Sequence, residues 1–294
     1  MFYVFSHFPC NDGEVSRMVW QYFVPNSVFY GWKHSDTATN VKIIEDLPPN
    51  SDIVFLDLSP PLYTLPIHHN YIIIDHHKDA IITMRNNIKF GDYKVKLYIE
   101  NGFPENNKLS GCMLTWKYHS HDPFPSVVRY IGSKDVWDFS DPNTEPYIIG
   151  YNLALAKCES QDARINFIMD LFEKERDNEF INVGLPIIAE YKEKAITVFE
   201  NVSYDSEVVG DTEYTIVEVK CTDYELFKYL IEYAEAHIDM DVLRILHSTK
   251  DGKNNYSLRS IKKDIKVDII ARKYGGNGHE RAAGYSVNIC DSIL

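Results

Sequence analysis

The sequence predicts an α/β protein in which a doubly wound parallel sheet domain is joined by a helical connector to a smaller α/β domain. Short apolar, β-branched runs alternate with amphipathic segments through the first half of the chain, a pattern typical of βαβ units. A more charged helical stretch follows, and the alternation resumes near Thr212. A chain of 294 residues is long enough for two domains. We expect them to span residues 1–175 and 206–294, with the connector at 176–205.

The first half contains four apolar runs that are predicted to be strands. They are Phe2–Phe5, Val28–Trp32, Ile53–Leu56 and Tyr71–Ile74. Apolar residues at helical spacing follow the first run, from Val15 to Phe23, and predict a helix. Residues 110–118, with Ser110 as the cap, and residues 127–131 are also expected to be helical.

Acids and imidazoles stand where these runs end. They are His7, Asp12, Asp57, Asp75, His76, His77 and Asp135. The carboxyl ends of neighbouring parallel strands meet in one crevice of a doubly wound sheet, so we expect these side chains to converge. Carboxylates with imidazoles and no thiolate cluster suit Mn²⁺ or Mg²⁺. Several carboxylates can hold two ions roughly 3.5–4 Å apart, the arrangement used in phosphoester hydrolysis.

The second half is predicted to begin with helices and to end in a glycine-rich loop. Residues from about Tyr147 to Glu200 form the helical stretch, with Pro186 expected in the first turn of a long helix. Thr222 and Glu225 have the spacing of a capping box for the next helix. The run Gly275–Gly284 has the backbone freedom to bind an anion through successive N–H groups.

A local excess of positive charge surrounds the glycine-rich loop. Residues 251–281 hold eight Lys or Arg and four acids, within a chain of net charge −13. Much of that charge is expected to be solvated surface, and Arg259 and His279 are the side chains that we expect to contact phosphate or base.

Composition excludes several classes of protein. The acidic net charge argues against a clamp on long DNA, which needs a positive field. No apolar stretch is long enough to cross a membrane, no signal peptide is recognisable, and no membrane partner is expected. Five scattered cysteines fit neither a zinc knuckle nor a disulfide framework, which favours a reducing, cytoplasmic setting.

Five motifs, in order and spacing, resemble the DHH phosphoesterase superfamily over nearly the whole chain, in its oligoribonuclease- and phosphodiesterase-like branch. The first is His7-x-x-Cys10-x-Asp12-Gly13, the second is the isolated Asp57, and the third is Asp75-His76-His77. The fourth is Asp135 in Lys134–Trp137, and the fifth, Gly275–His279, resembles the signature of the DHH-associated domain.

The resemblance implies a role for each of these residues. Asp57 would bridge two Mn²⁺ (or Mg²⁺) ions, with His7, Asp12, His76 and Asp135 as the further ligands. His77 would contact phosphate or lie just outside the ligands, and Asp75 would orient His76 or His77. The associated domain would bind substrate through a set of residues around its glycine loop: Arg259, Gly275, Gly276, Gly278 and His279.

Cys10 departs from the usual first motif, because many members of the superfamily carry an acid there. A thiolate ligand is one interpretation. We favour the other, a small buried filler, because a soft sulfur fits poorly in a site for hard ions. Whether both metal positions are filled depends on this residue.

The resemblance and the charge favour a metal-dependent phosphodiesterase. Its expected substrates are short oligonucleotides or small nucleotide diesters, cyclic ones included, which exonuclease-type hydrolysis would convert to mononucleotides. One alternative is an inorganic pyrophosphatase or polyphosphatase of the same superfamily. The other is an inactive nucleic-acid-binding scaffold. The sequence leaves RNA, DNA and cyclic dinucleotides open as substrates.

Overall fold

A computed structural model describes residues 1–89, 93–99, 108–200, 202, 204–250 and 252–288. The chain divides into two compact units, Met1–Leu185 and Pro186–Leu294. Helix α8 (Asp177–Phe199) contributes to both. The predicted fold class, a doubly wound parallel sheet domain and a second α/β domain, is confirmed.

The first unit is built on a five-stranded sheet in which every strand is parallel to its neighbours. Its strands are β1 (Phe2–His7), β2 (Val28–Trp32), β3 (Asp52–Leu56), β4 (Asn70–Ile74) and β5 (Lys94–Tyr98), in the order β2-β1-β3-β4-β5. The sequence analysis missed β5. Its alternating Lys and apolar residues are those of a half-exposed strand at the sheet edge, without the continuous apolar run of a central strand.

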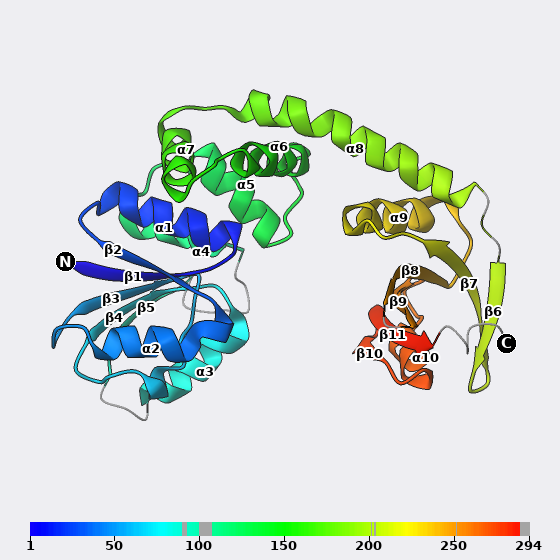
Figure 1. Ribbon diagram of the computed structural model, residues 1–294, viewed down its shortest axis with the longest axis horizontal. Helices are drawn as coiled ribbons and strands as arrows, with labels where there is room; N and C mark the ends of the chain where they lie inside the picture. Colours follow the sequence, from blue (N-terminus) through cyan, green and yellow to red (C-terminus); the bar gives the residue numbers. More distant parts are fainter. Residues whose placement is uncertain (90–92, 100–107, 201, 203, 251, 289–294) are drawn as a thin grey trace. The chain divides into compact units, whose positions relative to one another are not determined.

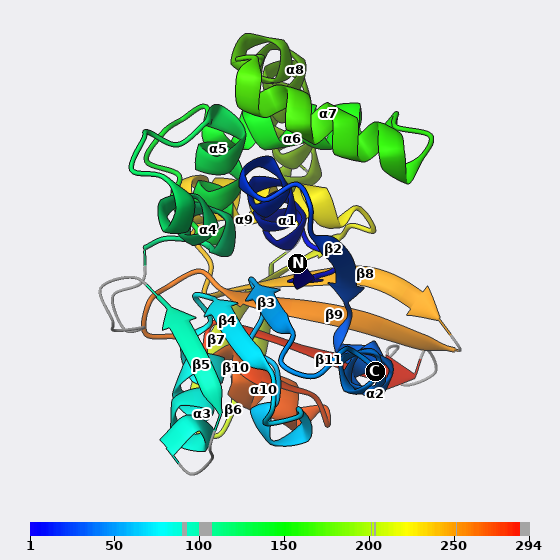
Figure 2. The ribbon, with the colours of Figure 1, turned by 90° about the vertical axis from the view of Figure 1, so that its left-hand side faces the viewer.

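Helices cover both faces of this sheet (Figure 1). One face carries α1 (Asn11–Phe23) and α4 (Gly111–His119), and the other carries α2 (Thr37–Glu45) and α3 (Lys78–Lys89). Alternate strand residues point to opposite faces, so Val4 and Val54 pack toward α1 and α4, whereas Phe5 and Phe55 lie in the core on the other side. Figure 2 shows the two layers with the sheet between them. Two short 3₁₀ segments, His34–Asp36 and Leu62–Thr64, complete this part.

A helical layer packs on α1 and α4. It contains α5 (Ser126–Asp135), α6 (Thr144–Ala156), α7 (Gln161–Glu173) and the first part of α8. The rings of Tyr147, Tyr151 and Phe180 are all buried in its core. The prediction for Pro186 was wrong: α8 begins at Asp177, so Pro186 lies inside the helix. Among the described residues, no helix is long and apolar enough to cross a membrane.

The second unit is built on a six-stranded mixed sheet in the order β10-β11-β9-β8-β7-β6. Its elements are β6 (Tyr204–Val209), β7 (Thr212–Lys220), α9 (Tyr224–His237), β8 (Val242–Lys250), β9 (Lys253–Ser260), α10 (Val267–Lys273), β10 (Asn277–His279) and β11 (Ala282–Asn288). Only β7 and β8, which α9 connects, are parallel among these described pairs. The predicted Thr222 cap was wrong, because Asp223 accepts the hydrogen bond from the Glu225 amide.

Candidate functional site

The strand order of the first sheet places a topological switch point between β1 and β3. From β1 the chain continues to β2 on one side, and from β2 it crosses to β3 on the other side of β1. The carboxyl ends of β1 and β3 therefore border a crevice. His7 ends β1, Asp57 directly follows β3, and Asp75 directly follows β4. The sequence therefore delivers the predicted polar side chains to one edge of one sheet.

Asp57 lies at the centre of this edge. It is almost fully buried, and its backbone adopts the left-handed region with φ of 53°. Its Oδ2 atom lies 3.5 Å from His7 Nδ1, and its Oδ1 atom lies 3.3 Å from His76 Nε2 and 3.8 Å from His77 Nδ1. Oδ1 accepts no hydrogen bond in the described part of the chain. The two oxygens thus face two different sets of ligand-type atoms.

Asp12 is held by the start of α4, about a hundred residues away in the chain. Its Oδ1 accepts hydrogen bonds from the Ser110 hydroxyl (2.7 Å) and the Cys112 amide (3.0 Å), and its Oδ2 accepts one from the Gly111 amide (2.6 Å). Asp12 therefore satisfies the amides that Ser110 was predicted to cap. Gly111 permits this approach, because a Cβ there would lie 2.6 Å from Asp57 Cβ and 2.8 Å from Asp12 Oδ2.

The ligand-type atoms form three overlapping groups, each with members within 4.8 Å of one another. They are His7, Cys10 and Asp57; Asp57, His76 and His77; and Asp12, His76 and Asp135. His76 Nε2 lies 3.1 Å from Asp135 Oδ2 and 3.9 Å from Asp12 Oδ2. The shared residues Asp57 and His76 connect the first group to the last. All five residues predicted as ligands come together here, with Cys10 in addition.

Charge is crowded in this cluster. Burial, with the neighbouring Asp57 and Asp135 carboxylates, raises the pKa of Asp12. Burial opposes ionisation of Asp57, yet the imidazoles of His7 and His76 hold the pKa of that carboxyl low. The contact with Asp57, followed by the one with Cys10, raises the pKa of His7 to about 10. The carboxylates of Asp12, Asp57 and Asp135 repel one another, so positive charge beside them stabilises their ionised forms.

Asp75 orients His77. Asp75 is completely buried, and its Oδ1 accepts hydrogen bonds from the His76 amide (2.8 Å) and from His77 Nδ1 (2.8 Å). The Ser59 hydroxyl donates to its other oxygen. The Asp75 carboxylate raises the pKa of His77, whose side chain is half-exposed. A cavity of about 390 Å³, lined among others by His7, Asp57, Asp75 and His77, opens at this point.

The donor set fits divalent metal ions. Buried carboxylates and imidazoles converge, and one oxygen of Asp57 is buried without a hydrogen-bond donor in the described residues. Oxygen and nitrogen donors of this kind suit Mn²⁺ and Mg²⁺, whereas thiolate ligands in general favour softer ions such as Zn²⁺.

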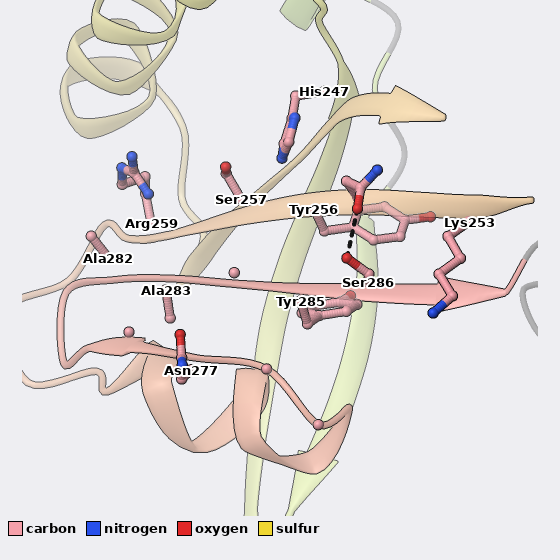
Figure 3. A pocket seen from close by; sticks show the side chains of 15 residues that line it. His247, Lys253, Tyr256, Ser257, Arg259, Asn277, Ala282, Ala283, Tyr285 and Ser286 are labelled. Atoms are coloured by element: carbon pink, nitrogen blue, oxygen red, sulfur yellow. Dashed lines mark hydrogen bonds between the residues drawn. The ribbon is translucent and has the colours of Figure 1, made fainter. Parts of the chain in front are cut away.

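The second unit contains a separate open cavity of about 800 Å³ (Figure 3). Four of the predicted substrate-binding residues line it: Arg259, Gly275, Gly276 and Gly278. One face of β9 carries every second residue: Asn255, Ser257 and Arg259. On the neighbouring strand β11, the small residues Ala282 and Gly284 pair with Arg259 and Ser257. Gly278, with φ of 149°, needs the conformational freedom of glycine. His279 lies in β10 and is not among the lining residues.

The cations of this unit divide into paired and unpaired groups. Most of the predicted positive residues have acidic partners, namely Lys262, Lys266, Arg272, Lys273 and Arg281. Arg259 and Lys253 line the cavity, and neither pairs with a carboxylate among the described residues. The half-buried Arg259 guanidinium donates to the Leu258 carbonyl at 2.9 Å. Arg259 therefore remains available to an anion.

Sequence reasoning missed His247, which also lines this cavity. The β8–β9 register shifts between Leu246 and Ser248, so His247 occupies a bulge, a feature that re-aims a side chain. The Tyr224 hydroxyl hydrogen-bonds its Nδ1 at 2.8 Å, and burial lowers the pKa of the ring. A histidine on a strand gave no signal in the sequence, because the bulge depends on pairing with β9.

Fold and site together define a two-unit α/β protein with an acidic, imidazole-rich cluster at a sheet edge. No known family profile matches the sequence. The chain is 24% identical, over a 303-residue alignment covering 96% of it, to the uncharacterized protein R106 of Acanthamoeba polyphaga mimivirus, and spans 66% of that protein's length.

Comparison with solved structures shows the fold in another protein. PggH from Vibrio cholerae, a pGpG-specific phosphodiesterase, superposes with a TM-score of 0.50 at 14% identity, over 99% of this chain and 95% of that chain. An exopolyphosphatase-related protein from Bacteroides fragilis covers 97% of this chain and 86% of its own at 16% identity, with a TM-score of 0.41. The likeness to PggH extends over both units of the fold.

Proposed function

We propose that this chain is a divalent-metal-dependent phosphoesterase of the DHH type. Its substrates would be short oligonucleotides or small nucleotide diesters, cyclic ones included, which it would hydrolyse to mononucleotides. The observation that carries the proposal is Asp57, whose two oxygens face two groups of ligand-type atoms. The five sequence motifs and the fold shared with the phosphodiesterase PggH support it.

Two ions would be held in different surroundings. His7, Cys10 and Asp57 would hold one, and Asp12, Asp57, His76 and Asp135 would hold the other. Divalent ions supply charge stabilisation for the attacking and leaving oxygens of a phosphoester. His77, oriented by Asp75 and half-exposed at the cavity, would donate a hydrogen bond to a phosphate oxygen.

Cys10 is a ligand in this proposal, contrary to the filler interpretation favoured from the sequence. Its sulfur lies within 4.8 Å of ligand atoms of both His7 and Asp57, where a filler has no reason to face them. The thiolate alternative, left open by the sequence, therefore has the stronger support.

The cavity of the second unit favours a nucleotide over an inorganic substrate. Its volume of about 800 Å³ exceeds what pyrophosphate fills, and glycine backbone, Arg259 and His247 offer both an anion contact and hydrogen-bonding groups. His279 stays a proposed phosphate contact. The acidic net charge, with Arg259 and Lys253 as cations without a carboxylate partner among the described residues that line the cavity, favours substrates of a few nucleotides over long strands.

Hydrolysis by the metal-stripped protein, with and without added Mn²⁺, tests the proposal. The substrates are the linear dinucleotide pGpG, a cyclic dinucleotide, a long single strand and inorganic pyrophosphate. Mn²⁺-dependent release of mononucleotide, lost in Asp57→Asn, is expected, with the dinucleotide favoured over the long strand. Hydrolysis of pyrophosphate alone would support the pyrophosphatase alternative. No hydrolysis of any substrate by a folded, metal-loaded protein would support the inactive scaffold.

A further inference from the structure

Trp137, two residues after Asp135 in the chain, is strongly exposed. Its relative exposure is 78%, whereas the other three tryptophans, Trp20, Trp32 and Trp116, are 1%, 1% and 6% exposed. A single exposed apolar side chain is normal on a protein surface. Exposure alone therefore carries no function, and the backbone supplies the second observation.

The backbone of Trp137 is held in a conformation that disfavours tryptophan. The Trp137 amide donates to the Lys134 carbonyl (3.1 Å) and the Asp138 amide to the Ser133 carbonyl (2.8 Å), the two hydrogen bonds of a Schellman motif that ends α5. Trp137 has φ of 57° at the position where glycine is usual. An exposed indole in left-handed backbone weakens the fold, and such strain concentrates at ligand-binding sites.

Trp137 stands close in the chain to a member of the candidate metal cluster. Trp137 follows two residues after Asp135, whose carboxylate lies 3.1 Å from His76 Nε2. The Phe139 ring meets the indole edge-on, with ring centroids 5.9 Å apart and planes at 69°. This contact supports one side of the indole, while most of its surface stays open to solvent.

We propose that Trp137, supported edge-on by Phe139, is a stacking platform for the nucleobase next to the phosphate that is hydrolysed. This inference rests on the proposed function, and it adds that the substrate carries a base on the metal side. Every base has a π-face, so stacking tolerates any base. The platform therefore selects nucleotide diesters over inorganic phosphates, without strong preference for one base.

Fluorescence gives a direct test, because the other three tryptophans are buried. The protein, with Mg²⁺, is titrated with AMP and with ribose 5-phosphate, which has the same phosphate and sugar but no base. We expect AMP to quench the emission of exposed tryptophan and ribose 5-phosphate to leave it unchanged. Equal quenching by both compounds, or by neither, would overturn the inference.

Kinetics of three proteins complete the test. Trp137→Gly suits the left-handed backbone and is expected to fold, to keep its metal affinity and kcat, and to raise KM for a dinucleotide roughly 5- to 150-fold, the range for losing one base stack. Trp137→Phe should lie between this variant and the unaltered protein. An unchanged KM in Trp137→Gly would contradict the platform.

The outcomes separate the inference from the proposed function. If the protein hydrolyses dinucleotides and Trp137→Gly leaves KM unchanged, the stacking role of Trp137 is refuted and the proposed function stands. If AMP quenches the fluorescence in a base-dependent way but no substrate is hydrolysed, the proposed function is refuted and base binding by Trp137 stands. A change of oligomeric mass in Trp137→Gly, measured by light scattering, would instead assign the indole to a protein contact and overturn the inference.

Discussion

Gly111→Ala is expected to disable the metal centre while leaving the fold intact. The added Cβ would lie 2.6 Å from Asp57 Cβ and 2.8 Å from Asp12 Oδ2. Carbon atoms in contact prefer roughly 3.5–4.0 Å, so one of the two aspartates must move by about 1 Å. A misplacement of about 1 Å in a catalytic group costs about 100-fold, or about 2.7 kcal/mol of barrier. Alanine itself favours a helix, since glycine is about 0.5–1 kcal/mol less stable there.

The assay combines Mn²⁺ binding by calorimetry, steady-state hydrolysis and thermal unfolding. Gly111→Ala should lose metal affinity and activity, and its Tm should fall by less than that of a variant whose Cβ meets rigid backbone. Gly184→Ala is the control, because its Cβ would meet the Pro146 carbonyl oxygen at 2.0 Å, between α8 and α6. The control should lower Tm and keep metal affinity. Gly111→Ala with unaltered metal binding and turnover would refute the assignment of Asp12 and Asp57 as ligands packed against α4.

Three other predictions concern separate parts of the molecule. In the Co²⁺-loaded protein, Cys10→Ala should abolish a sulfur-to-cobalt charge-transfer absorption, and Cys10→Asp should shift selectivity toward Mn²⁺; the same spectrum in Cys10→Ala would restore the filler interpretation. Arg259→Ala should weaken dinucleotide binding by about 1.5–3 kcal/mol, seen in KM with kcat unchanged, whereas Lys266→Ala, whose partner is Glu280, should match the unaltered protein. Burial lowers the pKa of His119 to about 4 from its usual 6.5. Because the unfolded chain takes up this proton more readily, His119 reduces stability as pH falls from 6.5 toward 4. The Tm advantage of His119→Phe should therefore grow over that range, and a constant difference would show that the ring does not titrate this way.

The central strands and their polar ends were predictable from sequence because both signals are local. An apolar β-branched run identifies a buried parallel strand, and the residue after it must lie at the carboxyl edge of the sheet. Asp57, Asp75 and His76 follow from that rule alone. The edge strand β5 escaped because its alternation of Lys with apolar residues resembles a solvated segment.

Features that depend on contacts between distant residues could not be predicted. Ser110 occupies the N-cap position of α4, as predicted, but Asp12, about a hundred residues away in the chain, accepts the hydrogen bonds of the Gly111 and Cys112 amides. The bulge that aims His247 exists only in the pairing of β8 with β9. The filler interpretation of Cys10 depended only on which ligands Mn²⁺ and Mg²⁺ prefer. In the structure Cys10 is the N-cap residue of α1, and this position brings its sulfur close to His7 and Asp57.

Left-handed backbone occurs at two positions next to the cluster, and it has a different meaning at each. Three non-glycine residues in the described ranges have positive φ: Asn50, Asp57 and Trp137. Asparagine and aspartate both tolerate this conformation, so Asn50 and Asp57 need no further explanation. Tryptophan does not share this tolerance, and Trp137 follows α5, the helix that carries Asp135 to the cluster. Folding alone would favour glycine at Trp137, so the reason for the indole lies in what it contacts. We infer that this contact is the base of the substrate.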